Sequence, residues 1–218
     1  MKKFFILILA ATLLIASTNM HAQTTVSVGA RAGLNIANFS FDPDVATGVT
    51  KSSRTGFKFG GALEVGFAPM FALQVEPMFS TGGSELSGPG GKLTFKTSLI
   101  EIPILFKVKI PVAGSVTPYA FVGPNLGLVL SSKSLVEAGG QSQETDWKDQ
   151  TSSINFALDF GAGAGFKVAP LTTILLDVRY SLGLANILND KGKQAYGGDQ
   201  SIKTTGFQII AGVMFGLN

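Results

Sequence analysis

The sequence predicts an all-β fold, specifically an eight-stranded antiparallel up-and-down transmembrane β-barrel. Three observations lead to this prediction. Only 14% of the 218 residues are charged, and the mean hydropathy is +0.35, whereas about a quarter of the residues are charged in ordinary soluble domains. Apolar residues alternate with polar or small ones in eight separate segments, which is the pattern of strands with two different faces. The connections between these segments alternate between short and long, as they do in membrane-spanning barrels.

The first 22 residues are predicted to be a secretory signal peptide, and residues 23–218 to be the barrel domain. Two lysines precede an apolar run over 4–16, which is shorter than the roughly 20 residues that a membrane-spanning helix needs. Small and polar residues then lead to a cleavage point after Ala22. Without the signal, the chain holds 15 basic and 14 acidic residues, with neither His nor Cys.

The first three predicted strands show the alternation clearly. Over 26–36, Val, Ala, Leu and Ile occupy the even positions, while Ser, Gly, Arg and Asn occupy the odd ones. Over 57–67, Phe, Gly, Leu and Val alternate with Lys, Gly, Ala and Glu. Over 71–80, Phe, Leu and Val alternate with Ala, Gln, Glu and Ser. Each segment therefore has one apolar face and one polar or small face.

The remaining five strands follow the same rule. They are predicted over 100–108, 119–130, 154–167, 174–183 and 206–215. The clearest of them is 154–167, where Ile, Phe, Leu and Ala alternate with Asn, Asp, Gly and Lys. No helix is predicted after the signal peptide, because no segment there repeats its apolar residues at helical spacing.

The connections predict how the strands close into a ring. Short connections are expected at 68–70, 111–117 and 169–172, and long ones at 38–54, 81–92, 131–152 and 186–203. We call the two ends the short-turn rim and the long-connection rim. The long connections are rich in Gly, Ser and Asp, so we expect solvated loops there. The first and last strands run in opposite directions and can pair, which leaves no free edge.

Side-chain size predicts which face of the barrel points outward. Of the 15 Phe residues in 23–218, 11 lie on the apolar faces. The interior of an eight-stranded barrel is just wide enough for side chains to fill, so this many Phe residues would overfill it. We therefore expect the Phe, Leu and Ile face to contact lipid and the Gly-rich face to line the lumen. Phe residues near both rims resemble two aromatic girdles.

The predicted lumen face carries charges of both signs. Its polar side chains are Arg31, Lys58, Glu64, Gln74, Glu76, Glu101, Lys107, Asp159, Lys167, Asp177 and Arg179. A buried charge is costly unless it is paired and hydrogen-bonded. We interpret the set as a structural plug of salt bridges, and a polar path for small solutes or ions is the alternative. Glu64 and Glu76 could serve as an acid–base pair, but so small a barrel is not expected to hold a substrate cleft.

Other sites are scarce in the sequence. Without His, Ser/His or Asp/His catalysis is not expected, and we predict no catalytic residue, cofactor or metal. Asp42 and Asp44 are interpreted as solvated loop carboxylates rather than as a Ca²⁺ site. No Lys/Arg block suggests nucleic-acid binding. Trp147 lies in the longest polar connection, where it either contacts a partner or packs against the base of its own loop.

Several segments together resemble one known family. They are GARAGLNIANFS (29–40), GFKFGGALEVGF (56–67), LQVEPMFSTGG (73–83), LIEIPILFKV (99–108), PYAFVGPNLGLVL (118–130), GAGAGFKV (161–168) and LLDVRYSLGLANI (175–187). In order and spacing they resemble the PorT-type outer-membrane β-barrel family common in Bacteroidetes, a small barrel of the OmpA/OmpX-like kind. The resemblance implies an outer-membrane location in contact with lipid and lipopolysaccharide, and assembly by the barrel-insertion machinery. It implies no reaction, although some family members are linked to type IX secretion.

Together, these observations predict a non-enzymatic outer-membrane barrel. We expect its long extracellular loops to bind an unidentified protein or surface polymer. One alternative is a narrow channel for small solutes or ions, which the lumen charges and glycines suggest. Another is an accessory role in type IX secretion, which rests on the family resemblance alone.

Overall fold

The computed structural model describes residues 24–45, 47–195, 198 and 200–217. The predicted signal peptide lies outside the described residues and stays a prediction. The described part holds ten strands: β1 Thr25–Asp42, β2 Thr50–Ala68, β3 Phe71–Val75, β4 Met78–Gly88, β5 Gly91–Lys109, β6 Val116–Ala138, β7 Gln141–Asp146, β8 Ile154–Ala169, β9 Thr172–Gly183 and β10 Ser201–Gly216. It also contains the 3-10 turn η1 (Lys148–Gln150) and the short helix α2 (Asp190–Ala195).

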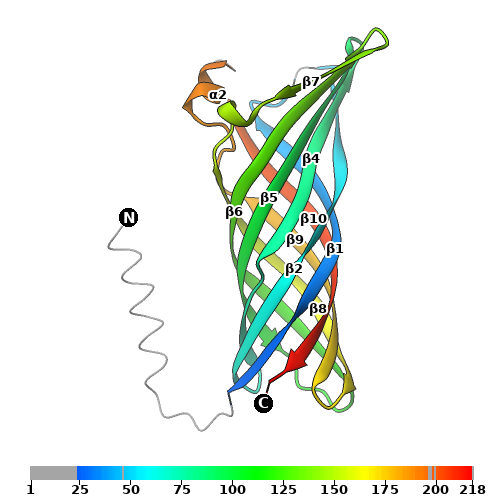
Figure 1. Ribbon diagram of the computed structural model, residues 1–218, viewed down its shortest axis with the longest axis vertical. Helices are drawn as coiled ribbons and strands as arrows, with labels where there is room; N and C mark the ends of the chain where they lie inside the picture. The colour runs from blue at the N-terminus through cyan, green and yellow to red at the C-terminus, as the bar shows by residue number, and fades with distance from the viewer. Residues whose placement is uncertain (1–23, 46, 196–197, 199, 218) are drawn as a thin grey trace, which may run out of the picture.

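The strands form a closed antiparallel ring of eight positions, which confirms the predicted fold class (Figure 1). Strands β3 and β4 share one position, because both pair with β2 on one side and with β5 on the other. The strand is interrupted between β3 and β4, where Pro77 has no N–H to donate to the ladder. The ladder continues across the break, since Pro77 O accepts from Gly61 N–H at 3.1 Å and Glu76 N–H donates to Pro103 O at 3.1 Å. The ring is closed by β1 and β10, which pair from Ser27 with Gly216 to Asp42 with Ser201.

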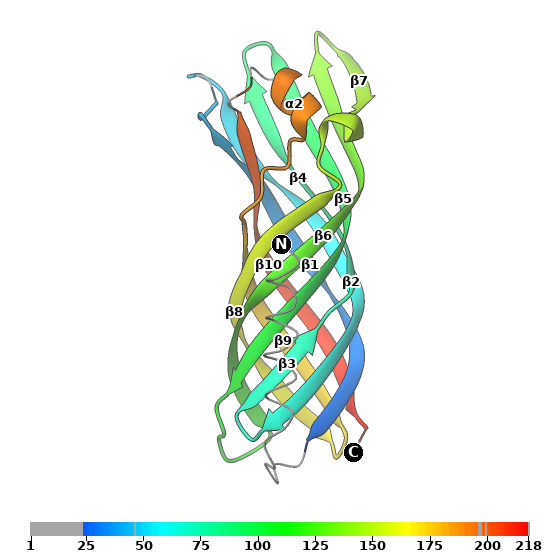
Figure 2. The same cartoon turned by 90° about the vertical axis from the view of Figure 1, so that its left-hand side faces the viewer.

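The wall of the barrel is taller on one side than a membrane requires. A transmembrane strand needs about 9–11 residues, whereas β5 has 19 and β6 has 23. Figures 1 and 2 show β4, β5, β6 and β7 rising together as an extended sheet at the long-connection rim. Strand β7 pairs with β6 and ends the strand order, so it is an edge strand of this sheet.

Three of the predicted long loops are therefore mostly strand. In the segment 38–54, β1 extends to Asp42 and β2 begins at Thr50. The segment 81–92 belongs to a hairpin in which only Pro89 and Gly90 lie between β4 and β5. In the segment 131–152, the turn between β6 and β7 is Gly139–Gly140, and both glycines have positive φ values of 58° and 79°. Such a turn favours glycine because other residues are strained there. The prediction was wrong because backbone pairing continues beyond the membrane, where both faces of a strand can be polar.

The expected absence of helix after the signal was also wrong. Helix α2 begins after Asn189, whose Oδ1 accepts from the Gly192 N–H at 3.0 Å, and Asp190 places a negative charge in its first turn. Both features stabilise a helix N-terminus. Six residues are too few for an apolar repeat to be visible in sequence. Among the helices of the described residues, none is long and apolar enough to cross a membrane.

The two faces of the wall are oriented as predicted. Phe57 and Phe59 are 51% and 53% exposed on the outside, whereas Arg31 and Arg179 are 2% and 0% exposed on the inside. Phe57, Phe59 and Phe79 contact one another with ring centroids 5.4–6.1 Å apart. A second group, Phe67, Phe71 and Phe106, makes contacts of 5.7–6.3 Å nearer the short-turn rim. These aromatic groups suit the two interfaces of a bilayer.

Glycines make room for large polar side chains inside the barrel. A Cβ added to Gly212 would collide with the Arg31 side chain, at 2.7 Å from its Nε. A Cβ on Gly163 would lie 2.7 Å from Cε2 of Tyr119 and would also meet the Asp177 carboxylate. The glycine excess of the sequence therefore reflects the crowding of the lumen.

Substitution of Gly212 by alanine is expected to destabilise the barrel by about 1–3 kcal/mol, because overpacking a filled interior forces side chains or backbone to shift. Gly90→Ala is the matched control, since nothing lies within 4 Å of a Cβ at that position. Urea midpoints of the two variants in phospholipid vesicles measure the difference. Equal midpoints would show that the lumen is not crowded at Gly212.

Candidate functional site

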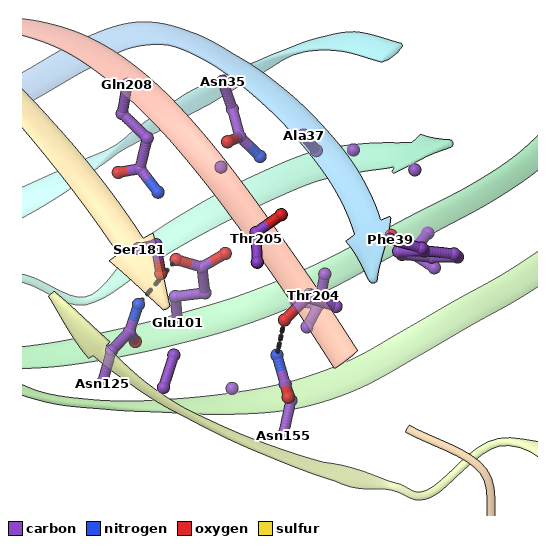
Figure 3. Close-up of a pocket in the computed structure, with 17 residues that line it drawn as sticks. Asn35, Ala37, Phe39, Glu101, Asn125, Asn155, Ser181, Thr204, Thr205 and Gln208 are labelled. Atoms are coloured by element: carbon purple, nitrogen blue, oxygen red, sulfur yellow. Dashed lines mark hydrogen bonds between the residues drawn. The ribbon is translucent and has the colours of Figure 1, made fainter. Parts of the chain in front are cut away.

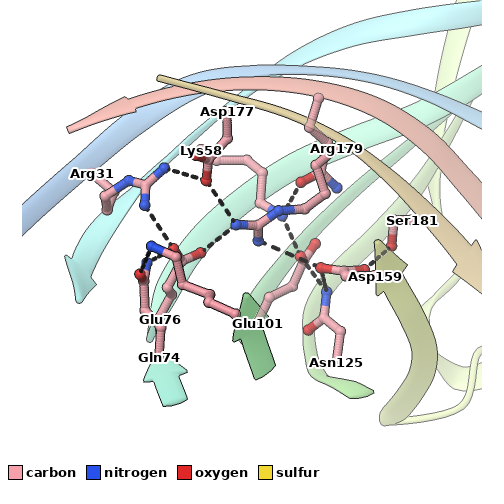
Figure 4. A network of polar contacts seen from close by, with 12 residues as sticks. Arg31, Lys58, Gln74, Glu76, Glu101, Asn125, Asp159, Asp177, Arg179 and Ser181 are labelled. Atoms are coloured by element: carbon pink, nitrogen blue, oxygen red, sulfur yellow. Dashed lines mark hydrogen bonds and ion pairs between the residues drawn. The ribbon is translucent and has the colours of Figure 1, made fainter. Parts of the chain in front are cut away.

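The polar residues of the lumen form one connected network, part of which is shown in Figure 4. Its acidic and basic members come from β1, β2, β5, β8 and β9 and from the short link between β3 and β4. We call it the lumen network, and its charged members are Arg31, Lys58, Glu64, Glu76, Glu101, Lys107, Lys109, Asp159, Asp177 and Arg179.

The centre of the network joins two arginines to two carboxylates. Arg31 Nη1 lies 3.0 Å from Glu76 Oε1, and Arg31 Nη2 lies 2.5 Å from Asp177 Oδ2. Arg179 Nη2 lies 2.8 Å from Glu76 Oε2 and 3.5 Å from Asp177 Oδ2. Each carboxylate is thus shared by both guanidinium groups. Mutual attraction and hydrogen bonding offset the large cost of removing these charges from water.

Toward the short-turn rim, the network continues through Glu64. Its Oε2 accepts from Lys107 Nζ at 2.6 Å, and its Oε1 lies 2.5 Å from Lys109 Nζ. Lys107 also donates to Gln74 Oε1 at 2.7 Å and lies over the Tyr119 ring, 3.9 Å from its centroid. Gln74 donates to Glu76, and the Tyr119 hydroxyl donates to Asp177. These amide and hydroxyl bonds link Glu64 to the arginine centre.

Toward the long-connection rim, the network continues through Lys58. Its Nζ lies 2.5 Å from Glu101 Oε2 and donates to Gln208 Oε1 at 3.1 Å. Asn125 Nδ2 donates to both Glu101 and Asp159, at 3.0 and 3.1 Å. Asp159 also accepts from the Ser181 hydroxyl at 2.6 Å, and Arg179 Nη1 lies 3.6 Å from its Oδ2. The network therefore extends along the lumen from both sides of Arg179.

The structure brings together all eight residues that the sequence analysis singled out as the lumen set: Arg31, Lys58, Glu64, Glu76, Glu101, Asp159, Asp177 and Arg179. Glu64 and Glu76 do not form an acid–base pair facing a cleft, because each is bound by its own cations. Lys167 pairs with Thr173 at the end of β8, and its side chain is exposed at the rim. Among the described residues, no ion pair joins it to the lumen network.

The sequence analysis did not identify several uncharged polar residues as members of the lumen network. Tyr119, Asn125, Ser181 and Gln208 share the lumen face by alternation, which was the available signal. Their contacts with charged groups depend on which strands face each other across the barrel. Lys109 lies one residue past the predicted end of its strand and has the same parity as Lys107.

An apolar cluster fills the barrel at the long-connection rim. We call it the apolar cap; its buried residues are Phe39, Phe95, Trp147, Ile187, Leu188 and Ile202. Trp147 is 4% exposed, and its ring centroid lies 4.9 Å from that of Phe95. The structure thus places Trp147 inside the cap, where it packs against side chains from β1, β5 and β10, and away from the loop surface where a partner would contact it.

A small cavity separates the cap from the lumen network (Figure 3). Its volume is about 40 Å³, and it is lined by residues that include Asn35, Asn125, Asn155 and Thr204. Among the described side chains, the Oδ1 atoms of Asn125 and Asn155 are buried without a hydrogen-bond partner. The space suffices for about three water molecules, which would supply the missing donors. The lumen therefore holds a polar network, a small cavity and an apolar cap in succession.

The described residues also bear on the sequence predictions for metal ligands and for the loop carboxylates. Within the part of the chain that the structure describes, no three His, Cys, Asp or Glu side chains gather to hold a metal ion. Asp44 Oδ1 lies 2.6 Å from Lys51 Nζ and accepts from the Val45 N–H at 2.8 Å. The hydrogen bond from Lys51 is the main reason why the pKa of the Asp44 carboxyl is lowered. This carboxylate forms a local ion pair at the long-connection rim.

The chain resembles known proteins in family and in fold. Residues 21–189, more than three quarters of the chain, match the family model described as outer membrane protein beta-barrel domain. The outer membrane protein OprG from Pseudomonas aeruginosa is 14% identical, with a TM-score of 0.55 over 90% of this chain and 97% of that chain. Neisserial surface protein A is 17% identical, with a TM-score of 0.48 over 87% and 96%. A search of the curated proteins found no match. At these identities, the likeness to the solved structures concerns the fold alone.

Proposed function

Because the chain belongs to the outer membrane protein β-barrel domain family, and is therefore a protein of the Gram-negative outer membrane, we propose that it is a closed, non-enzymatic barrel that binds a partner through its extracellular hairpins. Short turns of such barrels face the periplasm, which places the β4–β5 and β6–β7 hairpins outside the cell. The extended sheet β4–β5–β6–β7 is the observation that carries the proposal.

The filled lumen supports a role that does not depend on transport. Arg31, Glu76 and Arg179 are completely buried at the centre of the lumen network, and the apolar cap closes the extracellular end. A solute would have to displace both. Each carboxylate of the network is already held by a cation, so none is free to act as a general base.

The hairpins offer the accessible surface that a partner needs. All six residues of β7 are exposed, and its outer edge presents backbone groups that can pair with an added strand. The tips of the two hairpins lie next to each other, because Lys92 pairs with Glu137, and an open groove lies between residues 89–91 and 137–142. An extended peptide or a polymer with hydrogen-bonding groups matches this edge and groove.

Shortening the β6–β7 hairpin tests the proposal. Lys133 and Asp146 are paired, so residues 134–145 can be replaced by Asn-Gly, the preferred two-residue hairpin turn, while Trp147 remains in the cap. The variant is expected to fold and to lose a partner that the intact protein retains on cross-linking in native outer membranes. A matched control exchanges the same twelve residues for a Ser/Thr strand of equal length. Identical cross-linked species from all three proteins would contradict the proposal.

The channel remains the alternative, supported by the charges and glycines of the lumen. Planar bilayers distinguish the two functions, since a closed barrel gives no stable conductance steps. An accessory role in type IX secretion is a further candidate supported by the PorT-type resemblance, and loss of secreted cargo in a deletion strain would support it.

Acid is expected to loosen β7 from the sheet. Glu144 lies 2.8 Å from Lys133 Nζ and 3.0 Å from Lys96 Nζ, and the hydrogen bonds from these lysines lower the pKa of its carboxyl from 4.5 to about 2. Its contribution to stability is therefore present above pH 4.5 and is lost as the pH falls toward 2. A carboxyl titration by NMR measures this shift, and a midpoint near 4.5 would show that the two ion pairs are absent in solution.

A further inference from the structure

A polar pocket lies inside the barrel at the periplasmic rim, apart from the extracellular hairpins. Its volume is about 160 Å³, which is room for on the order of ten water molecules. Glu64, Lys107, Lys109 and two threonines, Thr117 and Thr173, line its polar side. We call it the periplasmic pocket.

The periplasmic pocket carries more positive than negative charge. Among the described residues that line it, Glu64 is the only one with a carboxylate, and both Lys107 and Lys109 contact it, at 2.6 and 2.5 Å. The nearest further carboxylates, Glu76 and Asp177, are bound by Arg31 and Arg179. The charged side chains that line the pocket are thus two cations, Lys107 and Lys109, and one carboxylate, Glu64. Arg179 also reaches Asp159 at 3.6 Å, without a hydrogen bond.

Lys109 is the group that can bind an additional anion. Its side chain is 25% exposed, whereas that of Lys107 is 2% exposed. An ammonium group has three donors, so Lys109 can keep its contact with Glu64 and donate to a second acceptor. Low-dielectric walls strengthen the attraction between this surplus charge and an anion inside the pocket.

The remaining wall favours an anion with a short apolar part. Leu175 and Met214 face the same cavity and belong to a buried apolar cluster that also includes Leu105. We propose that the periplasmic pocket binds a small organic monocarboxylate, with its carboxylate at Lys109 and its aliphatic part against Leu175 and Met214. Thr117 and Thr173 line the same pocket, and their hydroxyls can donate to the second carboxylate oxygen. The proposal is independent of any extracellular partner.

Butyrate titration tests the proposal on the whole barrel in nanodiscs at low ionic strength. We expect saturable NMR shifts at the amides of Thr117 and Thr173, and weaker binding as salt is added, because salt screens the attraction. Lys109→Gln should weaken butyrate binding by about tenfold or more, as expected for the loss of one hydrogen bond to a charged group. Lys203→Gln is the matched control, since Lys203 is exposed near the opposite rim, where it pairs with Ser40, and it should bind butyrate as the unaltered protein does.

Two further probes keep the interpretation specific. Butylammonium has the same aliphatic part with the opposite charge and should not bind, and chloride should bind more weakly than butyrate. Thr173→Glu adds a negative charge at the pocket and should abolish butyrate binding even if Lys109→Gln fails to fold. Equal binding of butyrate and butylammonium, equal binding of butyrate and chloride, or unchanged binding in both variants would overturn the proposal.

Discussion

Substitution of Arg179 by methionine is expected to destabilise the barrel by about 3–5 kcal/mol, the cost of breaking a buried ion pair by removing one partner. Arg179 is completely buried and is the contact that Glu76, Asp159 and Asp177 share. Methionine preserves much of the volume, so the effect comes mainly from charge: Asp159 loses its arginine, and Glu76 and Asp177 keep only Arg31. Urea midpoints in phospholipid vesicles measure the loss.

A double-mutant cycle separates charge from packing at this position. Glu76→Gln removes the carboxylate that lies 2.8 Å from Arg179. The combined variant Arg179→Met/Glu76→Gln should be less destabilised than the sum of the single variants, because neighbouring members of one network are coupled by about 0.5–3 kcal/mol. Additive losses would show that the ion pair is energetically unimportant. Lys167→Met, at an exposed position, controls for the substitution itself.

Substitution of Trp147 by alanine should open the apolar cap. Truncating a buried Trp costs about 3–5 kcal/mol in a core, and Trp147 contacts Phe95 in a cluster that joins three strands to the long connections. The cap packs above an intact network, so we expect local opening. Hydrogen exchange should become faster in residues 38–42, 93–97 and 186–195, while the urea midpoint of the barrel changes little.

Trp147→Phe provides the informative control for the cap. The indole Nε1 is buried without a hydrogen-bond partner among the described atoms, and an unpartnered buried donor is itself unfavourable. Phenylalanine keeps most of the contact with Phe95 and removes this donor, so it should leave hydrogen exchange near that of the unaltered protein. Faster exchange in both variants, or in neither, would contradict the assignment of Trp147 to the cap.

The barrel wall was predictable because one physical constraint acts at every second residue. Lipid outside and a narrow lumen inside require large apolar and small or polar side chains in turn, as Leu34 and Asn35 illustrate. Beyond the bilayer this constraint ends. Residues 131–138 are paired as strand in β6, yet water is available on their outer face, so the apolar alternation weakens and the segment was predicted to be a loop.

The lumen was predictable in composition but not in pairing. Alternation placed Glu64, Glu76 and Lys107 on the inner face, but the stagger of the strands decides that Lys107 contacts Glu64 and that Glu76 contacts the arginines. That stagger is a property of the closed ring. Trp147 shows the same limit, since its burial depends on partners as distant in sequence as Phe39 and Ile202.

The pairing of β1 with β10 has a consequence for the rate and order of folding. In every other neighbouring pair of strands, the paired residues lie much closer in sequence than Ser27 and Gly216, which belong to the first and last strands. Contacts of such long sequence separation raise the contact order and slow folding. We therefore expect the seam between the first and last strands to close last, once the final strand is available. Until then, the chain carries two unpaired strand edges that can pair with other chains, so the protein is most exposed to aggregation in this interval.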